Sequence, residues 1–369
     1  MKKFFFMMAL CTMVLSLQAE PYIGYVLTMT DIADFPDEEF EGVAQKPEAN
    51  AAQWFKENYV DKGIGRWVTV PEVAMGGLDA IGDLKAIWVN LDRMGSTSLV
   101  DYQIDADFVA NLKEYVKAGN NLFMTKKANH IIYEMGRIGY APGWGNTSYV
   151  MGGDDWAINP YLALWEGLGG VIDKSQHPLY EGLATVVNPD HGKDVFPMVG
   201  ANPRTDNNDF WVDYFRKNPE TGLYISREEA EGNPEKWGDY CHYDNGNPLR
   251  LSEYEADWNL EVLGVWGQVQ DHCSGGLVIF KPEGEFKGTI VSCGFAAYQW
   301  GTSNVWLDNV KKLSANALKY VAPSVGTAVE NVTTTEAVKG VYNLLGQKVA
   351  RENMVHGSIY IVDGKKVIY

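Results

Sequence analysis

Carboxylates occur in close pairs at two places, Asp154 with Asp155 and Asp206 with Asp209. Two carboxyl groups a few ångströms apart are what glycoside hydrolases use, one as an acid and the other as a base or nucleophile. The chain holds 48 acidic residues, so such pairs also arise by chance and then face water. The pairs leave sugar hydrolysis open without establishing it.

Two histidines are candidates for an acid or a base. His130 is expected on the helix that follows the central buried strand, near the ligand crevice of an open sheet. His177 precedes Pro178, where a histidine more often hydrogen-bonds the backbone of a turn. His130 is therefore the better candidate if the protein is an enzyme.

Cysteine adjoins histidine at Cys241–His242 and at His272–Cys273. Neighbouring residues on an extended chain point to opposite sides, and the two-residue spacing of zinc ligands is absent. A disulfide between Cys241 and Cys273 is the alternative, whereas Cys293 is expected to be a buried thiol in a strand. No glycine-rich phosphate loop follows a strand. The sequence thus predicts no metal and no cofactor.

The elements that must position these groups begin with alternating apolar strands and amphipathic helices. Strands are predicted at 22–27, 67–70, 85–91 and 121–125, and helices at 51–59, 107–118 and 128–138. This order is typical of an α/β fold, a parallel sheet covered by helices on both faces. Loops at the carboxyl ends of such strands line the ligand crevice.

Polar residues at two strand ends and aromatic residues in irregular segments make up the predicted binding site. Aromatic faces stack on the C–H faces of sugar rings while polar groups take the hydroxyls, although the same rings could simply pin long loops. Asp92 and Arg93 could also form an ion pair with each other. The predicted ligand-binding residues are Asp92, Arg93, Lys126, Trp144, Trp156, Tyr298 and Trp300.

Periodic segments are scarce from about 139 to 257 and return as strands at 260–266, 276–280 and 289–293 and a helix at 304–321. The stretch 323–327, Pro-Ser-Val-Gly-Thr, is typical of a linker. Short strands are expected within 340–349 and 358–369. The predicted organisation is a leader at 1–19, an α/β domain at 20–322 with an insertion at about 190–257, a linker at 323–327 and a small β tail at 328–369.

The chain begins like a secretory signal peptide. Lys2 and Lys3 precede an apolar run from Phe4 to Leu17, and Ala19 stands at the expected cleavage position. The run is too short for a membrane span, and Cys11 lies inside it rather than at a lipoprotein cleavage site. We expect an exported protein of the periplasm, cell surface or medium, with no transmembrane segment.

The formal net charge of −17 argues against nucleic acid, because such binding needs clustered Lys and Arg. The same charge disfavours sulfated or uronic glycans unless it is countered locally. A neutral oligosaccharide or polysaccharide, or a surface protein partner, is the expected ligand.

Four stretches resemble the ThuA-like branch of the class I glutamine amidotransferase-like fold. They are Lys85–Arg93, Phe108–Asn121, Ser175–Leu183 with its His-Pro and Gly-Leu, and Lys287–Gly294, which is followed by a closing helix. The resemblance covers about residues 22–322, departs at 190–257 and implies a flavodoxin-like parallel sheet.

Within that fold the chain is similar to exported Bacteroidota proteins linked to polysaccharide utilisation. Residues 340–369 also resemble the C-terminal tails of exported Bacteroidota proteins, some of which are sorting signals for a secretion system.

The resemblance also implies where a nucleophile would stand. In glutamine amidotransferases the third buried strand ends in a sharp elbow that presents a Cys between glycines. The corresponding stretch here, Phe123–His130, contains Lys126 and Lys127 but no Cys and no Gly. We therefore expect neither the strained turn nor amidotransferase chemistry.

Three functions remain. The favoured one is a non-catalytic, exported carbohydrate-binding or accessory protein of a polysaccharide-utilisation system. The alternatives are a sugar-active hydrolase or isomerase that uses His130 or an acidic pair, and a structural surface protein that interacts with partner subunits.

Overall fold

The computed structural model describes most of residues 22–323 and four short strands between residues 341 and 368. The gaps in the first range are 41–42, 94–95, 97, 140–155, 163–170, 190, 200–211, 214–215, 238–247, 267–273 and 295–299.

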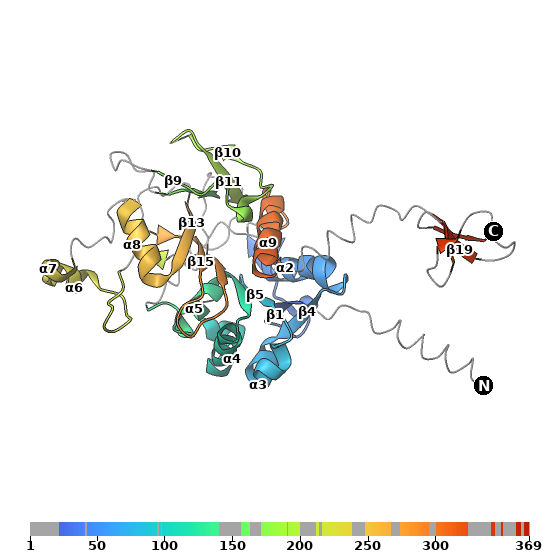
Figure 1. Cartoon of the computed structure of the whole chain (residues 1–369), viewed down its shortest axis with the longest axis horizontal. Coiled ribbons are helices and arrows are strands. Elements are labelled where there is room, and N and C mark those ends of the chain that lie inside the picture. Colours follow the sequence, from blue (N-terminus) through green and yellow to red (C-terminus); the bar gives the residue numbers. More distant parts are fainter. Residues whose placement is uncertain are drawn as a thin grey trace. The chain divides into compact units, whose positions relative to one another are not determined.

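A ten-stranded mixed sheet runs through the larger part of the molecule (Figure 1), in the order β10-β11-β7-β13-β15-β16-β6-β5-β1-β4. One half is parallel: β4, β1, β5, β6 and β16 are joined by parallel pairs. In chain order these strands are arranged 2-1-3-4-5, which is the flavodoxin-like arrangement. Their bounds are Ile23–Leu27 (β1), Gly65–Thr69 (β4), Ala86–Leu91 (β5), Asn121–Lys126 (β6) and Ile290–Cys293 (β16).

The other half of the sheet is antiparallel and continues from β16 through β15, β13, β7, β11 and β10. Strands β7, β10 and β11 come from the segment that lacks clear periodicity, whereas β13 and β15 match the strands predicted at 260–266 and 276–280. The bounds are Trp156–Asn159 (β7), Val186–Val187 (β10), Asp194–Val199 (β11), Leu260–Trp266 (β13) and Leu277–Phe280 (β15).

Helices cover both faces of the parallel half, as the sequence predicts. Figure 1 shows α2 and α9 on one side and α3 and α4 on the other. The core strands are buried along their whole length, which explains their continuous apolar runs. The bounds are Pro47–Phe55 (α2), Val70–Ile81 (α3), Ala106–Lys117 (α4), His130–Glu134 (α5) and Leu307–Val321 (α9).

The two faces have different cores. On the α3–α4 side, aliphatic residues such as Ile87 and Val89 of β5 pack with Phe108 and Leu112 of α4. On the α2 side the contacts are aromatic: Trp88 of β5 lies 6.0 Å from Trp54, ring centre to ring centre.

Helix α3 is the main element that the sequence analysis did not predict. Thr69 begins it with a capping box, its side chain accepting from the N–H of Glu72 while the Glu72 carboxylate accepts from the N–H of Thr69. Gly77, at φ +50°, breaks the helix, and Asn111 of α4 donates to the Val73 and Ala74 carbonyls beside the break. The glycines hid the helical pattern. The predicted helix at 128–138 is also shorter, ending at Glu134.

The remaining elements are short apart from the eleven-residue helix α8. They are β2 (Glu38–Phe40), β3 (Val43–Gln45), β8 (Tyr161–Leu162), β9 (Ile172–Asp173), β12 (Val212–Asp213), β14 (Ser274–Gly275), α6 (Arg227–Gly232), α7 (Pro234–Trp237) and α8 (Pro248–Trp258), with helical turns at Ile32–Asp34 (η1), Lys56–Val60 (η2), Leu99–Tyr102 (η3), Lys127–Asn129 (η4) and Pro178–Tyr180 (η5). None of the described helices combines the length and apolar character needed to cross a bilayer.

The chain separates into two compact units, one ending at Ala322 and the other beginning at Pro323. The second unit contains a four-stranded antiparallel sheet in the order β18-β17-β19-β20. Its strands are Val341–Asn343 (β17), Lys348–Val349 (β18), Ile359–Val362 (β19) and Lys365–Ile368 (β20).

Because each unit is compact by itself, removing residues 328–369 should leave the thermal midpoint of the larger unit unchanged. Differential scanning calorimetry of the chain ending at Thr327, beside the full chain, measures this. A lowered midpoint would mean that the small sheet is integral to the larger unit.

Candidate functional site

Charged side chains gather where β1, β5 and β6 end. Asp92 and Arg93 follow β5, and Lys126 is the last residue of β6. Strands β1 and β5 are neighbours, and the connections that leave them pass to opposite faces of the sheet. In open α/β sheets this is the topological switch point, where ligands bind.

The structure brings Asp92, Arg93 and Lys126 together but pairs them differently from the prediction. Lys126 Nζ lies 3.3 Å from Asp92 Oδ1, and the two side chains are 0% and 2% exposed. Arg93 Nη2 lies 3.1 Å from Glu48 Oε2. The expected Asp92–Arg93 pair is replaced by these two pairs, because each side chain finds its partner on a neighbouring element.

Arg93 joins three elements. Its guanidinium donates to Thr28 Oγ1 just after β1, to Glu48 of α2 and to the carbonyl of Asp101 in η3. It also lies 4.7 Å from the centre of the Tyr102 ring. The guanidinium therefore serves to hold loops together, in a region that the sequence analysis assigned to ligand contacts.

Glu48 is a member of this cluster that sequence reasoning missed. It occupies the first turn of α2, after Pro47, and accepts from the Asp92 N–H as well as from Arg93. Burial raises its pKa to about 7, although the Arg93 charge opposes that rise. The sequence shows only an ordinary first-turn acid, so nothing local indicates this role.

The backbone at Lys126 corrects the expectation of an unstrained strand end. Its φ of 57° and ψ of −131° lie in a region that favours glycine, at a cost on the order of 1–3 kcal/mol. The strand passes directly into η4 and α5, so the sharp strand-to-helix elbow is present without any flanking glycine. Buried packing holds the strained turn that local sequence does not favour.

Of the four aromatic residues predicted to stack on a ligand, Trp300 is the one whose side chain lies within the described part of the chain. Trp300 is 1% exposed, its ring centre 5.2 Å from Trp54 and 5.7 Å from Trp88, so it is a core residue rather than a stacking platform. Trp156 lies in β7. Trp144 and Tyr298 lie outside the described residues, as do the two acidic pairs and Cys241 and Cys273.

His130 begins α5, directly after η4, and is 8% exposed. Cys293 is a buried free thiol in β16, as predicted. Among the described residues, no three His, Cys, Asp or Glu side chains gather as a metal site would require.

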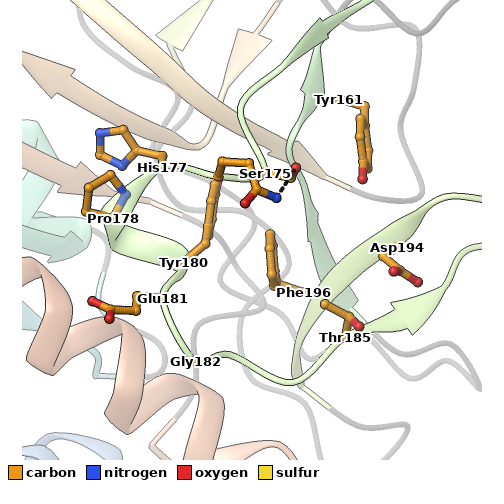
Figure 2. Close-up of a pocket in the computed structure, with 11 residues that line it drawn as sticks. Tyr161, Ser175, His177, Pro178, Tyr180, Glu181, Gly182, Thr185, Asp194 and Phe196 are labelled. Atoms are coloured by element: carbon orange, nitrogen blue, oxygen red, sulfur yellow. Dashed lines mark hydrogen bonds between the residues drawn. The ribbon is translucent and has the colours of Figure 1, made fainter.

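An open pocket lies in the antiparallel half of the molecule (Figure 2). Its volume is about 500 Å³, within the range of small-molecule sites. Tyr161 stands across from Tyr180 and Phe196, whose rings stack with their centres 4.4 Å apart. The polar residues of its lining are Ser175, Gln176, His177, Glu181, Thr185 and Asp194.

Helix α9 holds the pocket loop in place through two asparagines. Asn316 donates to the carbonyls of Leu179 and Glu181. Asn309 donates to the Ala184 carbonyl and accepts from the Ala184 N–H. The loop from 178 to 184 is thereby fixed to a long helix, although it contains little regular structure.

Glycine 264 in β13 makes room for the pocket floor. A Cβ at Gly264 would lie 2.7 Å from the Tyr180 hydroxyl, which donates to the Leu263 carbonyl at 2.8 Å. Tyr180 is thus fixed at both its hydroxyl and its ring.

His177 is the turn residue that the sequence predicts. Its Nδ1 accepts from the Leu179 N–H, so Nε2 carries the proton in the neutral ring. Burial lowers its pKa, with Lys174 adding to the effect and Glu261 opposing it. Tyr161, Gln176 and Asp194 were missed because they come from three separate segments and share no motif.

No family model and no curated protein matches the chain. Among solved structures, the cytoplasmic protein STM3548 from Salmonella typhimurium aligns over 82% of this chain and 99% of its own length, with 11% identity and a TM-score of 0.40. The case for function therefore rests on the geometry of this molecule.

The raised pKa of Glu48 predicts a pH dependence of stability. Between about pH 4.5 and 7 the folded state keeps a proton that the unfolded state releases, so the free energy of unfolding falls as the pH rises. The fall is on the order of 3 kcal/mol, at about 1.4 kcal/mol per pKa unit. Glu48→Gln cannot ionise and should flatten this slope.

Urea denaturation from pH 4.5 to 8 measures the effect. Glu57→Gln is the control. It changes an exposed carboxylate in η2, the helical segment that follows α2, and should keep the wild-type slope. Equal slopes in wild type and Glu48→Gln would contradict the assignment.

Proposed function

We propose that this chain is an exported carbohydrate-binding accessory protein that holds a neutral oligosaccharide in the pocket of Figure 2 without cleaving it. The observation that carries the proposal is the pocket's composition: aromatic walls beside carboxylate, amide and hydroxyl groups, open to solvent.

The pocket suits a sugar ring because its aromatic walls can contact the C–H faces of the ring and its polar walls can bind the hydroxyl groups. Tyr161 is half-buried and borders the cavity, and Lys193 lies over its ring at 4.7 Å without lining the pocket. The face toward the cavity can then stack on ring C–H groups. Gln176, Thr185 and Asp194 are exposed and can exchange hydrogen bonds with hydroxyls.

Charge supports a neutral ligand. Glu181 and Asp194 line the cavity, and the lining residues include no Lys or Arg. The net charge of the whole chain is −17. The net charge of the whole chain therefore disfavours a sulfated or uronic glycan.

Binding without amidotransferase chemistry is supported by the residue at the elbow. Where glutamine amidotransferases present a thiol, this chain has Lys126, whose amine lies 3.3 Å from Asp92 Oδ1. Export and a role in polysaccharide utilisation are supported by the leader-like start and by the resemblance described above, and they belong to the same proposal.

The test begins with a glycan array and continues with calorimetry on the best ligand. Tyr161→Ala should weaken binding about tenfold, equivalent to about 1.4 kcal/mol, because one sugar–aromatic stack is lost. Asp194→Asn should weaken it less, since the amide keeps an acceptor. The wild-type affinity should be micromolar to millimolar, as for other shallow, open sites.

Tyr133→Ala is the matched control, because Tyr133 is a partly exposed tyrosine that does not line this pocket. It should bind like the wild type. An unchanged affinity in Tyr161→Ala would remove the pocket from the proposal. Hydrolysis of the ligand, followed by chromatography, would favour the enzyme alternative instead.

A further inference from the structure

Lys126 combines two unfavourable features in one residue. Its backbone adopts φ 57° and ψ −131°, where a glycine would be unstrained. Its side chain is a charged amine that is fully enclosed. A residue that has both a strained backbone and an enclosed charge is a candidate for a role that needs its side chain, because strain of this kind concentrates at functional sites.

The neighbouring lysine shows that enclosure alone does not explain the arrangement. Lys127 is 1% exposed, and its Nζ donates to the Arg93 carbonyl at 2.9 Å, which braces the loop after β5. Lys126 Nζ lies 3.3 Å from the carboxylate of Asp92. An amine beside a carboxylate is a nucleophile next to a group that can take up and return its proton.

Lys126 occupies the backbone position at which other α/β folds place a nucleophile, although its own side chain is enclosed. It stands at the junction between a central parallel strand and the helical turn that follows. This is the place where a strand-to-helix elbow exposes a reacting side chain in other α/β folds. It also lies at the carboxyl edge of β5 and β6, beside the switch point.

We propose that Lys126 is a nucleophilic amine that forms an imine with a small aldehyde or ketone, and that Asp92 carries its proton. This site shares no residue with the pocket of Figure 2 and does not depend on the function proposed for it. Since the amine is enclosed, the carbonyl compound must be small, and surrounding side chains must give way to admit it.

The reaction needs no further reagent. Asp92 takes one proton from the Lys126 ammonium, and the neutral amine attacks the carbonyl carbon to form a C–N bond. The former carbonyl oxygen takes up that proton and a second one from the nitrogen and leaves as water. A protonated C=N bond remains, with the positive charge on nitrogen and Asp92 again a carboxylate.

The experiment traps this bond in the full chain. Glycolaldehyde or dihydroxyacetone is added with sodium cyanoborohydride, which reduces an imine to a stable amine, and peptides are analysed by mass spectrometry. Lys126 should be modified at least about tenfold faster than Lys127, with a rate that saturates as the carbonyl compound increases. An exposed lysine such as Lys62 should react without saturation.

The comparison of two adjacent, equally enclosed lysines in one wild-type molecule decides the matter even if variants fold poorly. Modification of Lys126 no faster than of Lys127 overturns the proposal. Asp92→Asn should slow the reaction at Lys126 and leave Lys62 unchanged, with circular dichroism reporting the fold. Equal rates at Lys126 in Asp92→Asn and wild type would remove Asp92 from the proposed step.

Discussion

Buried charged side chains lie at the carboxyl ends of β1, β5 and β6, and each needs an oppositely charged partner. The rest of the molecule depends on this constraint. Glu48, Asp92, Arg93 and Lys126 form two pairs: Lys126–Asp92 is removed from solvent, and Arg93–Glu48 is mostly buried. Losing one partner of such a pair leaves an uncompensated charge, at a cost of about 3–5 kcal/mol. The elements that contribute these groups, α2 and the ends of β5 and β6, must therefore stay in register.

Aromatic packing extends this constraint to distant parts of the chain. Trp54 of α2 contacts both Trp88 of β5 and Trp300, which follows β16 by seven residues. Asn50 of α2 also donates to the Trp300 carbonyl. The helix that supplies Glu48 is in this way fixed to the last parallel strand region, so the charged cluster rests on a rigid aromatic base.

The same architecture separates the two places where chemistry is proposed. The parallel half encloses its polar groups at the strand ends. In the antiparallel half, several polar residues that line the pocket of Figure 2 are exposed, and asparagines of α9 hold the pocket loop from 178 to 184. The parallel half therefore holds an enclosed, strained residue, Lys126. The antiparallel half holds the open pocket of Figure 2, which has both aromatic and polar walls.

Local sequence was sufficient where structure depends on local pattern. Continuous apolar runs and 3.6-residue periodicity correctly indicated β1, β5, β6, α4 and α9, and hence the α/β class with a flavodoxin-like sheet. The strand ends at Asp92 and Lys126 were likewise placed correctly, because parallel strands end at one edge.

Tertiary structure alone decided which groups meet and which are exposed. Trp300 follows a strand and seemed suited to a ligand, yet two tryptophans distant in sequence enclose it. Lys126 has no glycine beside it, yet packing imposes the elbow. Tyr161, Gln176 and Asp194 line one cavity because β8, the loop beyond β9, and β11 come together in the folded chain. Sequence periodicity depends only on residues that are close along the chain. The burial of a side chain, its ion pairs and its backbone strain depend on contacts between distant segments, which no local pattern specifies.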